Sequence, residues 1–401
     1  MRLLTFSTLY PSAARPIHGI FVETRLRELL SSGMAESKVV APVPWFPWRH
    51  SVFGEYARQA SVPTQENRYG IEILHPRYPH IPKVGMTAAP FLLARAVAPV
   101  IARLRRSYDF DAIDAHFLYP DGVAAVMLGE RFGRPVVITA RGSDVTLFPR
   151  YRLPRSLIRW AARKAAALIT VSRALKDDLV SLGVPPRHIT VLRNGVDLQR
   201  FRPEDRESAR AKLGLHCPTL LSVGHLIPRK AHDLVISALA HLSNVDLIIV
   251  GNGPEQKRLR TLARSVGVDS RVRFVPALLQ QELPTYYSAA EALVLASTRE
   301  GWANVLLEAM ACGTPVVASD VGGAAELVTS CDAGVLFRER TPEALATAIR
   351  TLLNAYPDHL ATRRHAEKFS WVATTRGQID LFHSVIAEHR QSQAYAAPSP
   401  S

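Results

Sequence analysis

The chain has 401 residues, a formal net charge of +14, 47% hydrophobic residues and 21% charged residues. Since one hydrophobic core seldom serves more than about 250–300 residues, this length predicts a folded protein of roughly two domains. No apolar run reaches the ~20 residues of a membrane-spanning helix. Residues 1–16 contain no long apolar stretch or small-residue cleavage site, and the three cysteines have no CxxC spacing. We therefore expect a cytoplasmic protein with neither a disulfide framework nor a zinc site.

The positive charge favours an anionic partner, which can be a nucleic acid, a phosphorylated small molecule or an anionic membrane surface. Charge alone does not choose among these partners. A nucleic-acid-binding protein is the less favoured class, because the arginines lie mainly on amphipathic helical patterns without a stacking-aromatic motif.

In chain order, short apolar runs alternate with helical patterns. The alternation starts at the N-terminus, breaks at 194–207, where a Gly turn and a Pro occur, and restarts after Pro203. The apolar runs are 2–7, 111–117, 135–140 and 167–172, then 219–224, 245–251, 272–276, 292–296 and 315–319. Strands that are apolar on both faces and separated by helices indicate parallel sheets covered on each side.

We therefore predict an α/β fold of two Rossmann-like, doubly wound domains facing across a cleft. The first comprises residues 1–197 and the second residues 198–370. A helix over about 371–390 is expected to pack back on the first domain. The polar, Pro-rich tail 391–401 is expected to be disordered.

Ligands of such sheets bind beyond the carboxyl ends of the strands, so residues that follow strands are candidates for a site. In the first domain, Gly19 begins the first helix, where a missing side chain lets backbone approach a ligand closely. Arg141 and Asp144 follow a later strand, where they either bind an acceptor or pair with each other. The other candidates of this domain are His116, Ser172, Arg173 and Asn194.

The second domain contains cations and carboxylates after two of its strands. Arg229 and Lys230 follow the run 219–224 before a helical pattern, where they can clamp a diphosphate or form a solvated basic turn. Glu300 follows the run 292–296, and Glu308 lies about one turn into the next helix. Glu308 can also be a simple partner of the helix dipole. Cations for phosphate and carboxylates for hydroxyl groups together suit a nucleotide sugar.

The stretch "EGWANVLLEAMACGTPVVAS" resembles the Glu-x7-Glu signature of retaining group 1 glycosyltransferases, also called glycosyltransferase family 4, which have the GT-B fold. The resemblance implies that Glu300 contacts the transferred sugar, Glu308 the ribose, and Arg229 with Lys230 the diphosphate. It further implies that His116 reaches the sugar and that the loop of Gly19 borders the donor phosphate. Backbone amides of Ala303, Asn304 and Val305 would bind phosphate, and "VGGAAELV", with Gly322, Gly323 and Glu326, resembles the loop after the next strand.

One position departs from the family pattern: His225 stands where the family commonly has Arg. The clamp then rests on Arg229 and Lys230. With two cations and helix amides to stabilise the leaving diphosphate, no metal or other cofactor is expected. The Asp-x-Asp pair of Asp109 and Asp111 precedes a strand, which favours a solvated turn over a metal site.

Within the family, the sequence resembles bacterial enzymes of cell-envelope or exported-polysaccharide synthesis, which act on lipid-linked acceptors. The donor is then expected to be a UDP-sugar or GDP-mannose. A sugar-nucleotide epimerase of the same fold is the alternative enzyme class.

The charge excess also predicts docking at the inner face of an anionic membrane. Two helical patterns, 90–109 and 150–166, place arginines and lysines beside Leu, Ile and Trp160. The segment "VPWFPWRH" adds Trp45, Phe46 and Trp48 next to Arg49. Basic amphipathic helices flanked by aromatic residues bind in the interfacial plane. The alternative is that these apolar residues face an ordinary core.

Overall fold

The computed structural model describes residues 1–79 and 85–396, and the chain divides into two compact units. Unit 1 comprises Met1–Leu192 and the C-terminal segment from Val372, and unit 2 comprises Arg193–Trp371. The sequence prediction places the boundary between residues 197 and 198. The structure assigns Arg193 and Asn194 to unit 2, because the side chain of Arg193 pairs with Glu326 and the backbone oxygen of Asn194 accepts from Trp302.

Unit 1 is built on a sheet in the order β10-β9-β8-β7-β1-β2-β5-β4, in which only β4 is antiparallel to its neighbour. Its central strands β7 and β8 are buried on both faces, as an apolar run predicts. The strands are β1 (Arg2–Phe6), β2 (Glu36–Val40), β4 (Gln65–Arg68), β5 (Ile71–Leu74), β7 (Ala112–His116), β8 (Val136–Ala140), β9 (Ala167–Thr170) and β10 (Ile189–Val191). A separate pair joins β3 (Val43–Pro44) to β6 (Arg77–Tyr78).

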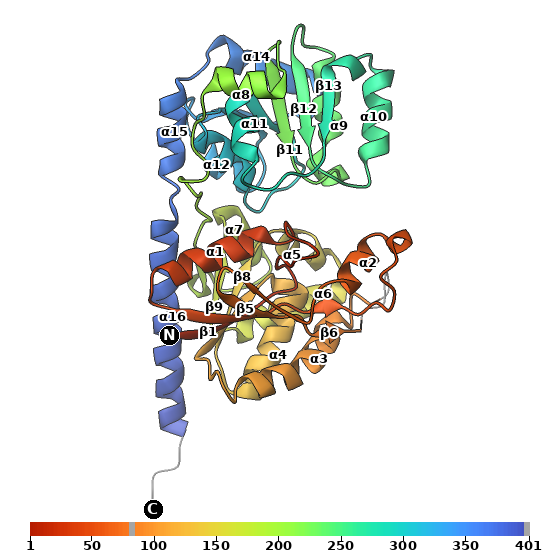
Figure 1. The fold of residues 1–401 in the computed structure, drawn as a ribbon. Coiled ribbons are helices and arrows are strands. Elements are labelled where there is room, and N and C mark those ends of the chain that lie inside the picture. Colours follow the sequence, from red (N-terminus) through yellow and green to blue (C-terminus); the bar gives the residue numbers. More distant parts are fainter. Residues whose placement is uncertain (80–84, 397–401) are drawn as a thin grey trace, which may run out of the picture. The chain divides into compact units, whose positions relative to one another are not determined.

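Helices cover this sheet (Figure 1). Those of unit 1 are α1 (Ile20–Ser31), α2 (Glu55–Ala60), α3 (Ala89–Leu104), α4 (Val123–Phe132), α5 (Ser143–Thr146), α6 (Arg152–Lys164), α7 (Arg173–Ser181) and α16 (Trp371–Ala396). On one face, Leu29 of α1 and Phe382 of α16 share a core cluster with Leu3, Val137 and Ile169 of the sheet. Helix α4 packs against α3 and α6.

The C-terminal helix is longer than predicted. The expected disordered tail begins at residue 391, but α16 continues to Ala396, and residues 397–401 lie outside the described part of the chain. Side-chain contacts anchor its last turns: Arg390 pairs with Asp111 at 2.7 Å, and Gln393 lies 3.0 Å from His389 one turn earlier. Gln and Ala are also good helix formers, so the polar composition of this segment is no obstacle to a helix.

Unit 2 is built on an all-parallel sheet in the order β13-β12-β11-β14-β15-β16. Its strands are β11 (Thr219–Val223), β12 (Asp246–Val250), β13 (Val272–Val275), β14 (Ala292–Leu295), β15 (Val316–Ser319) and β16 (Gly334–Phe337). Its helices are α8 (Arg206–Leu213), α9 (His232–Leu239), α10 (Gln256–Ser265), α11 (Leu283–Ala289), α12 (Asn304–Ala311), α13 (Ala324–Leu327), α14 (Pro342–Asn354) and α15 (His359–Glu367).

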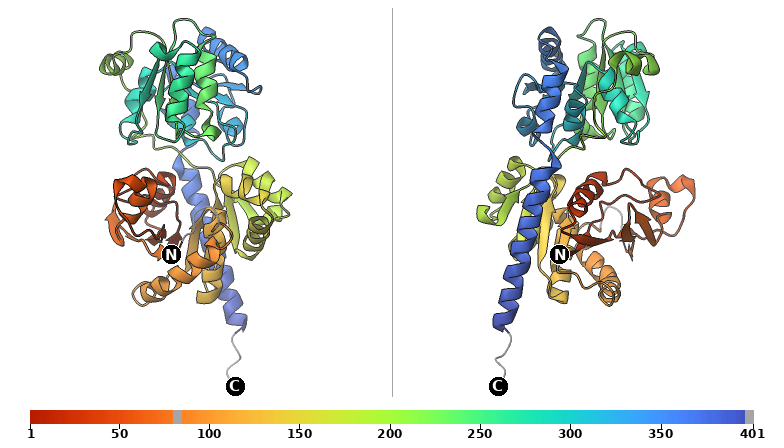
Figure 2. Two further views of the ribbon diagram at one scale, coloured as in Figure 1. Left: turned by 90° about the vertical axis from the view of Figure 1, so that its right-hand side faces the viewer. Right: turned by 60° about the vertical axis from the view of Figure 1, so that its left-hand side comes forward.

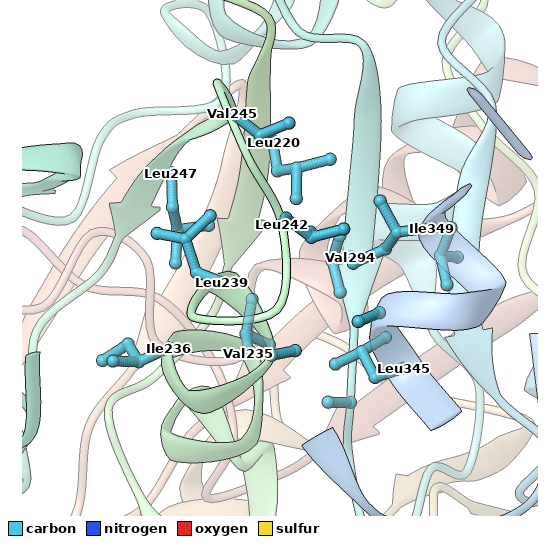
Figure 3. Packing of buried hydrophobic residues seen from close by; sticks show 14 of the residues in the cluster. Leu220, Val235, Ile236, Leu239, Leu242, Val245, Leu247, Val294, Leu345 and Ile349 are labelled. Atoms are coloured by element: carbon cyan, nitrogen blue, oxygen red, sulfur yellow. The ribbon is translucent and has the colours of Figure 1, made fainter. Parts of the chain in front are cut away.

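The helices of unit 2 pack in two groups, α9 with α10 and α14, and α12 with α11 and α15 (Figure 2). The first group forms a continuous apolar core with the sheet, in which Leu220, Val294 and Leu345 are labelled in Figure 3. Side chains cap several helices: Asp205, Thr341 and Asp358 each accept a hydrogen bond from the third helical residue.

Both sheets reverse their strand order at one place, and ligand sites of doubly wound folds lie at such a switch point. In unit 2 the reversal lies between β11 and β14, which pair in parallel, and in unit 1 between β1 and β7. The loops that follow these four strands carry Lys230, Glu300, Gly19 and the residues after His116.

Candidate active site

In unit 2, the loop after β11 is hydrogen-bonded to the loop after β14. Arg229 and Lys230 lie in a 3₁₀ turn, Pro228–Lys230, directly before α9, rather than inside the helix. The backbone N–H of Thr298 donates to the Arg229 oxygen at 2.8 Å, and the Arg229 guanidinium donates to the Arg299 oxygen at 3.0 Å. The two loops therefore position the cations beside the segment that carries Glu300.

Glu300 is the centre of a charged cluster. Its carboxylate accepts from Lys230 Nζ at 2.6 Å and lies 3.5 Å from Arg229 Nη1. The Glu300 side chain is 6% exposed. Burial alone would raise the pKa of Glu300, but the charges of Lys230 and Arg229 outweigh burial and hold the pKa below its ordinary value. Glu300 is therefore an oriented carboxylate, and the cluster carries a net positive charge.

The N-terminus of α12 follows Glu300 by a few residues. Ala303 is the N-cap residue, and no side chain caps the helix there. The side chain of Asn304 accepts a hydrogen bond from Asn194 at 3.2 Å. The amides of a first helical turn and the positive end of the helix dipole attract anions. The first turn, with Asn304 and Val305, thus adds to the positive potential around Lys230.

Glu308 lies one turn into α12 in a different environment. The hydroxyl of Tyr287, a fully buried residue of α11, donates to Glu308 Oε2 at 2.8 Å. Burial raises the pKa of Glu308 to about 7, and the hydrogen bond from Tyr287 opposes this effect only in part. The two carboxyl groups thus differ in their protonation behaviour. The cations keep Glu300 ionised, whereas Glu308, with a pKa of about 7, changes its charge near neutral pH.

The loop after β15 packs on the backbone of Glu300. Gly322 has φ +50°, and a Cβ atom there would lie 1.9 Å from the Glu300 oxygen. The N–H of Gly323 donates to the same oxygen at 3.3 Å. Glu326 pairs with Arg193 Nε at 2.9 Å. The glycine pair therefore supports the Glu300 loop, and Glu326 has a structural partner.

In unit 1, Gly19 is the N-cap residue of α1. It has φ +70°, and a Cβ atom would lie 2.3 Å from the carbonyl carbon and oxygen of Leu9. Glycine is therefore required for the close approach of α1 to the β1 loop. The same loop is held by Asp121, whose carboxylate accepts from the Thr8 backbone N–H at 2.7 Å. Burial raises the pKa of Asp121 to about 7.

His116 is buried at the end of β7 between two charged neighbours. Its Nδ1 lies 2.8 Å from Arg141 Nη2, and its Nε2 lies 3.2 Å from Asp114 Oδ2. Since a guanidinium only donates, Nδ1 is the acceptor and the neutral ring carries its proton on Nε2. Burial lowers the pKa of His116, and Arg141 adds to this effect against the opposing charge of Asp114. Nδ1 is thus hydrogen-bonded to Arg141, whereas Nε2 lies near Asp114 without a hydrogen bond of ordinary geometry.

The remaining candidates of the first domain have structural bonds. Asp144 accepts from the backbone N–H of Gly142 and of Leu118, each at 2.7 Å, and from the backbone N–H of Arg141 at 3.1 Å, so it organises the turn after β8. Ser172 caps α7 through a hydrogen bond from Leu175 N at 3.2 Å. Asn194 lies in unit 2, where its side chain bonds to Asn304.

The aspartates of the Asp-x-Asp pair are both in ion pairs. Asp109 accepts from Arg134 at 2.7 and 2.8 Å, and Asp111 accepts from Arg390 at 2.7 Å.

The sequence did not predict three residues that contact the site candidates or their loops: Tyr287, Asp121 and Asp114. Asp114 has a local signal, because it lies two residues before His116 and alternate residues of a strand share a face. Tyr287 reaches Glu308 from another helix, and Asp121 reaches a loop far away in the sequence, so neither has a local signal.

Solved structures share this architecture. A sucrose-phosphate synthase from Thermosynechococcus elongatus has a TM-score of 0.80 at 21% identity, covering 97% of this chain and 100% of the other. Anabaena HepE in complex with UDP-glucose has a TM-score of 0.71 at 20% identity, covering 98% and 100%. The two-unit parallel α/β architecture is therefore the GT-B fold of glycosyltransferases.

Sequence comparisons identify the family. The model described as "Glycosyl transferases group 1" matches residues 205–369, and the model "Glycosyltransferase Family 4" matches residues 44–200. The putative teichuronic acid biosynthesis glycosyltransferase TuaC of Bacillus subtilis is 30% identical over 408 residues, which cover 100% of both chains. A D-inositol 3-phosphate glycosyltransferase of Rhodococcus opacus is 29% identical, covering 87% and 84%. The chain belongs to the group 1 glycosyltransferases of the family 4 type, and that family prediction is confirmed.

Proposed function

We propose that the protein is a retaining hexosyltransferase that moves a sugar from a UDP-sugar or GDP-mannose to a lipid-linked or glycan acceptor. Its place would be the synthesis of a bacterial cell-envelope or exported polysaccharide. The observation that carries the proposal is the buried Lys230–Glu300 pair at the switch point of unit 2. The similarity to TuaC supports the polysaccharide class, and the HepE complexes with UDP and UDP-glucose support the donor class.

The donor diphosphate binds beside Lys230 and Arg229 in this proposal. An ammonium group has three donors, so Lys230 can keep its bond to Glu300 and also bind a phosphate oxygen. The helix amides of Asn304 and Val305 bind a second phosphate oxygen. Glu300 accepts from hydroxyl groups of the sugar, and Glu308 accepts from those of the ribose.

Catalysis is then mainly electrostatic. As the sugar leaves the diphosphate, negative charge grows on the phosphate oxygens and positive charge on the sugar. Lys230, Arg229 and the α12 N-terminus stabilise the first, and the ionised Glu300 stabilises the second. The leaving phosphate takes the proton of the acceptor hydroxyl, so neither a protein nucleophile nor a metal ion is needed for the transfer.

A screen of nucleotide sugars by thermal shift tests the donor assignment. A ligand at about 100 times its Kd adds about 2.7 kcal/mol to the free energy of unfolding. We expect one family of UDP- or GDP-sugars to raise Tm in the wild type and a smaller rise in Lys230→Ala. No stabilisation by any nucleotide sugar would contradict the proposed function. Release of nucleoside diphosphate that needs an acceptor separates transfer from epimerisation.

A further inference from the structure

Unit 1 carries an exposed aromatic cluster, formed by Trp45, Phe46, Trp48, Phe53 and Tyr56. The cluster follows β3 and extends through a 3₁₀ turn, Ser51–Phe53, into α2. Trp45 and Trp48 are each 58% exposed, Tyr56 is 40% exposed and Phe53 is 38% exposed. Single exposed apolar residues are normal, but a contiguous patch of large apolar side chains is typical of an interaction site.

The rings of the cluster pack on one another rather than on the core. Phe46 lies in the middle, with ring centroids 5.6 Å from Trp48, 5.4 Å from Phe53 and 5.2 Å from Tyr56. The 3₁₀ turn has no buried residue, and α2 buries only alanines. In Figures 1 and 2, α2 lies at the outer edge of unit 1. The cluster is therefore a preformed apolar surface that the core does not use.

The charges beside the cluster are mainly positive. Residues 43–60 contain Arg49 and Arg58, and Glu55 is their single carboxylate. Glu55 is already neutralised, because Arg15 lies 2.7 Å from it and Arg58 lies 3.7 Å from it. The surface therefore combines exposed rings with uncompensated positive charge.

The two helices that the sequence predicts for membrane docking, α3 and α6, bury several of their apolar residues in unit 1. Helix α3 buries Leu93, Val97 and Ile101, and helix α6 buries Ile158 and its neighbouring alanines. These residues belong to the core of unit 1, whereas Phe91 of α3 and Leu153 of α6 are each 48% exposed. Neither helix gathers its exposed apolar residues into a set of stacked rings like that of the aromatic cluster.

We propose that the aromatic cluster docks unit 1 on an anionic lipid surface. Trp and Tyr place an apolar ring and a polar N–H or O–H group at one level, which matches the headgroup region of a bilayer. Arg49 and Arg58 supply the attraction to anionic headgroups. Insertion of the aromatic rings and this electrostatic attraction are each weak, and together they give reversible binding. Only the purpose of docking, access to a lipid-linked acceptor, rests on the proposed function; the binding itself does not.

Vesicle sedimentation without any substrate tests this inference. The vesicles contain phosphatidylglycerol and phosphatidylethanolamine, and vesicles of phosphatidylcholine are the neutral control. We expect binding that rises with the anionic fraction and falls with salt. Trp45→Ser/Trp48→Ser should weaken partitioning about tenfold, and Arg49→Ala about fivefold, since one cation near an anionic surface contributes about that factor.

Matched variants distinguish the effect of the aromatic cluster on vesicle binding from the effects of positive charge or an exposed ring elsewhere in the chain. Two matched variants are Arg103→Glu/Arg106→Glu, at and just beyond the C-terminal end of α3, and Tyr395→Ser, at a residue 90% exposed near the end of α16. Both should change partitioning less than Trp45→Ser/Trp48→Ser. All variants should keep the wild-type Tm and nucleotide-sugar shift, because none of these residues lies in the donor site.

Three results would overturn the inference. Equal sedimentation of wild type and Trp45→Ser/Trp48→Ser would remove the cluster as the docking surface, and equal binding to neutral vesicles would remove the charge argument. A wild-type dimer that becomes a monomer in Trp45→Ser/Trp48→Ser, without vesicle binding, would make the cluster a contact between copies of the chain. The failure of the donor screen would leave vesicle binding unaffected, so the two proposals fail separately.

Discussion

Replacing Lys230 by Ala tests both the stability and the binding that the charged cluster implies. Lys230 Nζ lies 2.6 Å from Glu300 Oε1, and the two side chains are 14% and 6% exposed. Removing one member of a buried ion pair costs about 3–5 kcal/mol, because the other charge stays buried. Arg229 remains 3.5 Å from Glu300, so we expect the lower end of this range in urea unfolding.

Binding should fall as well, in a ligand-dependent way. A charge-assisted hydrogen bond to phosphate contributes about 1.5–3 kcal/mol, so the affinity for nucleoside diphosphate should fall about ten- to a hundredfold. The affinity for the bare nucleoside should hardly change. Titration calorimetry with both ligands measures the difference.

The double variant Lys230→Ala/Glu300→Gln is the control. It also removes the buried charge of Glu300, which Arg229 alone balances in Lys230→Ala, so most of the lost stability should return while the affinity for diphosphate stays low. Equal losses for diphosphate and nucleoside would refute the assignment of Lys230 to the phosphates. A double variant as unstable as the single one would refute the ion-pair explanation.

Four further outcomes are expected. Glu300→Gln should bind nucleoside diphosphate at least as tightly as the wild type, because a competing anion is removed, yet lose most transfer; calorimetry and a product assay decide. Glu308→Gln should weaken nucleotide binding. It should also change the pH dependence of stability: the raised pKa of Glu308, about 7 against 4.5, stabilises the folded wild type below pH 4.5, and this stabilisation, at most about 3 kcal/mol, is lost as pH rises through 7. The variant should lack this slope in Tm between pH 5 and 7.5. Gly322→Ala should lower transfer more than tenfold in kinetic assays, since its Cβ would meet the Glu300 oxygen, whereas Gly267→Ala, with φ +73° and open space, should cost only about 1–2 kcal/mol of backbone strain. EDTA should leave transfer unchanged, and a strict need for a divalent cation would contradict the metal-independent mechanism.

The strand ends could be predicted because parallel sheets bury whole apolar runs. The residues after these runs, such as Lys230 and Glu300, follow from the alternation alone, and the structure brings these two into contact. Their catalytic roles stay predictions.

Tertiary contacts account for what the sequence does not disclose. Asn194 follows a first-domain strand in sequence, yet its bonds to Trp302 and Asn304 place it in unit 2. Ser172 follows a strand and also caps α7, a role that the sequence alone does not reveal, and its place in a binding site stays a prediction. The tail 391–396 reads as polar and disordered, whereas the contacts of Arg390 and Gln393 keep it helical.

Acceptor-dependent release of nucleoside diphosphate is the most direct test of the central claim, that the Lys230–Glu300 site transfers a sugar from a nucleotide donor. The wild type is incubated with its stabilising nucleotide sugar, with and without a lipid-linked glycan, and the product is examined by NMR. We expect release only with acceptor, retention of the anomeric configuration, and loss of both signals in Glu300→Gln. Undiminished transfer by Glu300→Gln, or an inverted product, would contradict the claim.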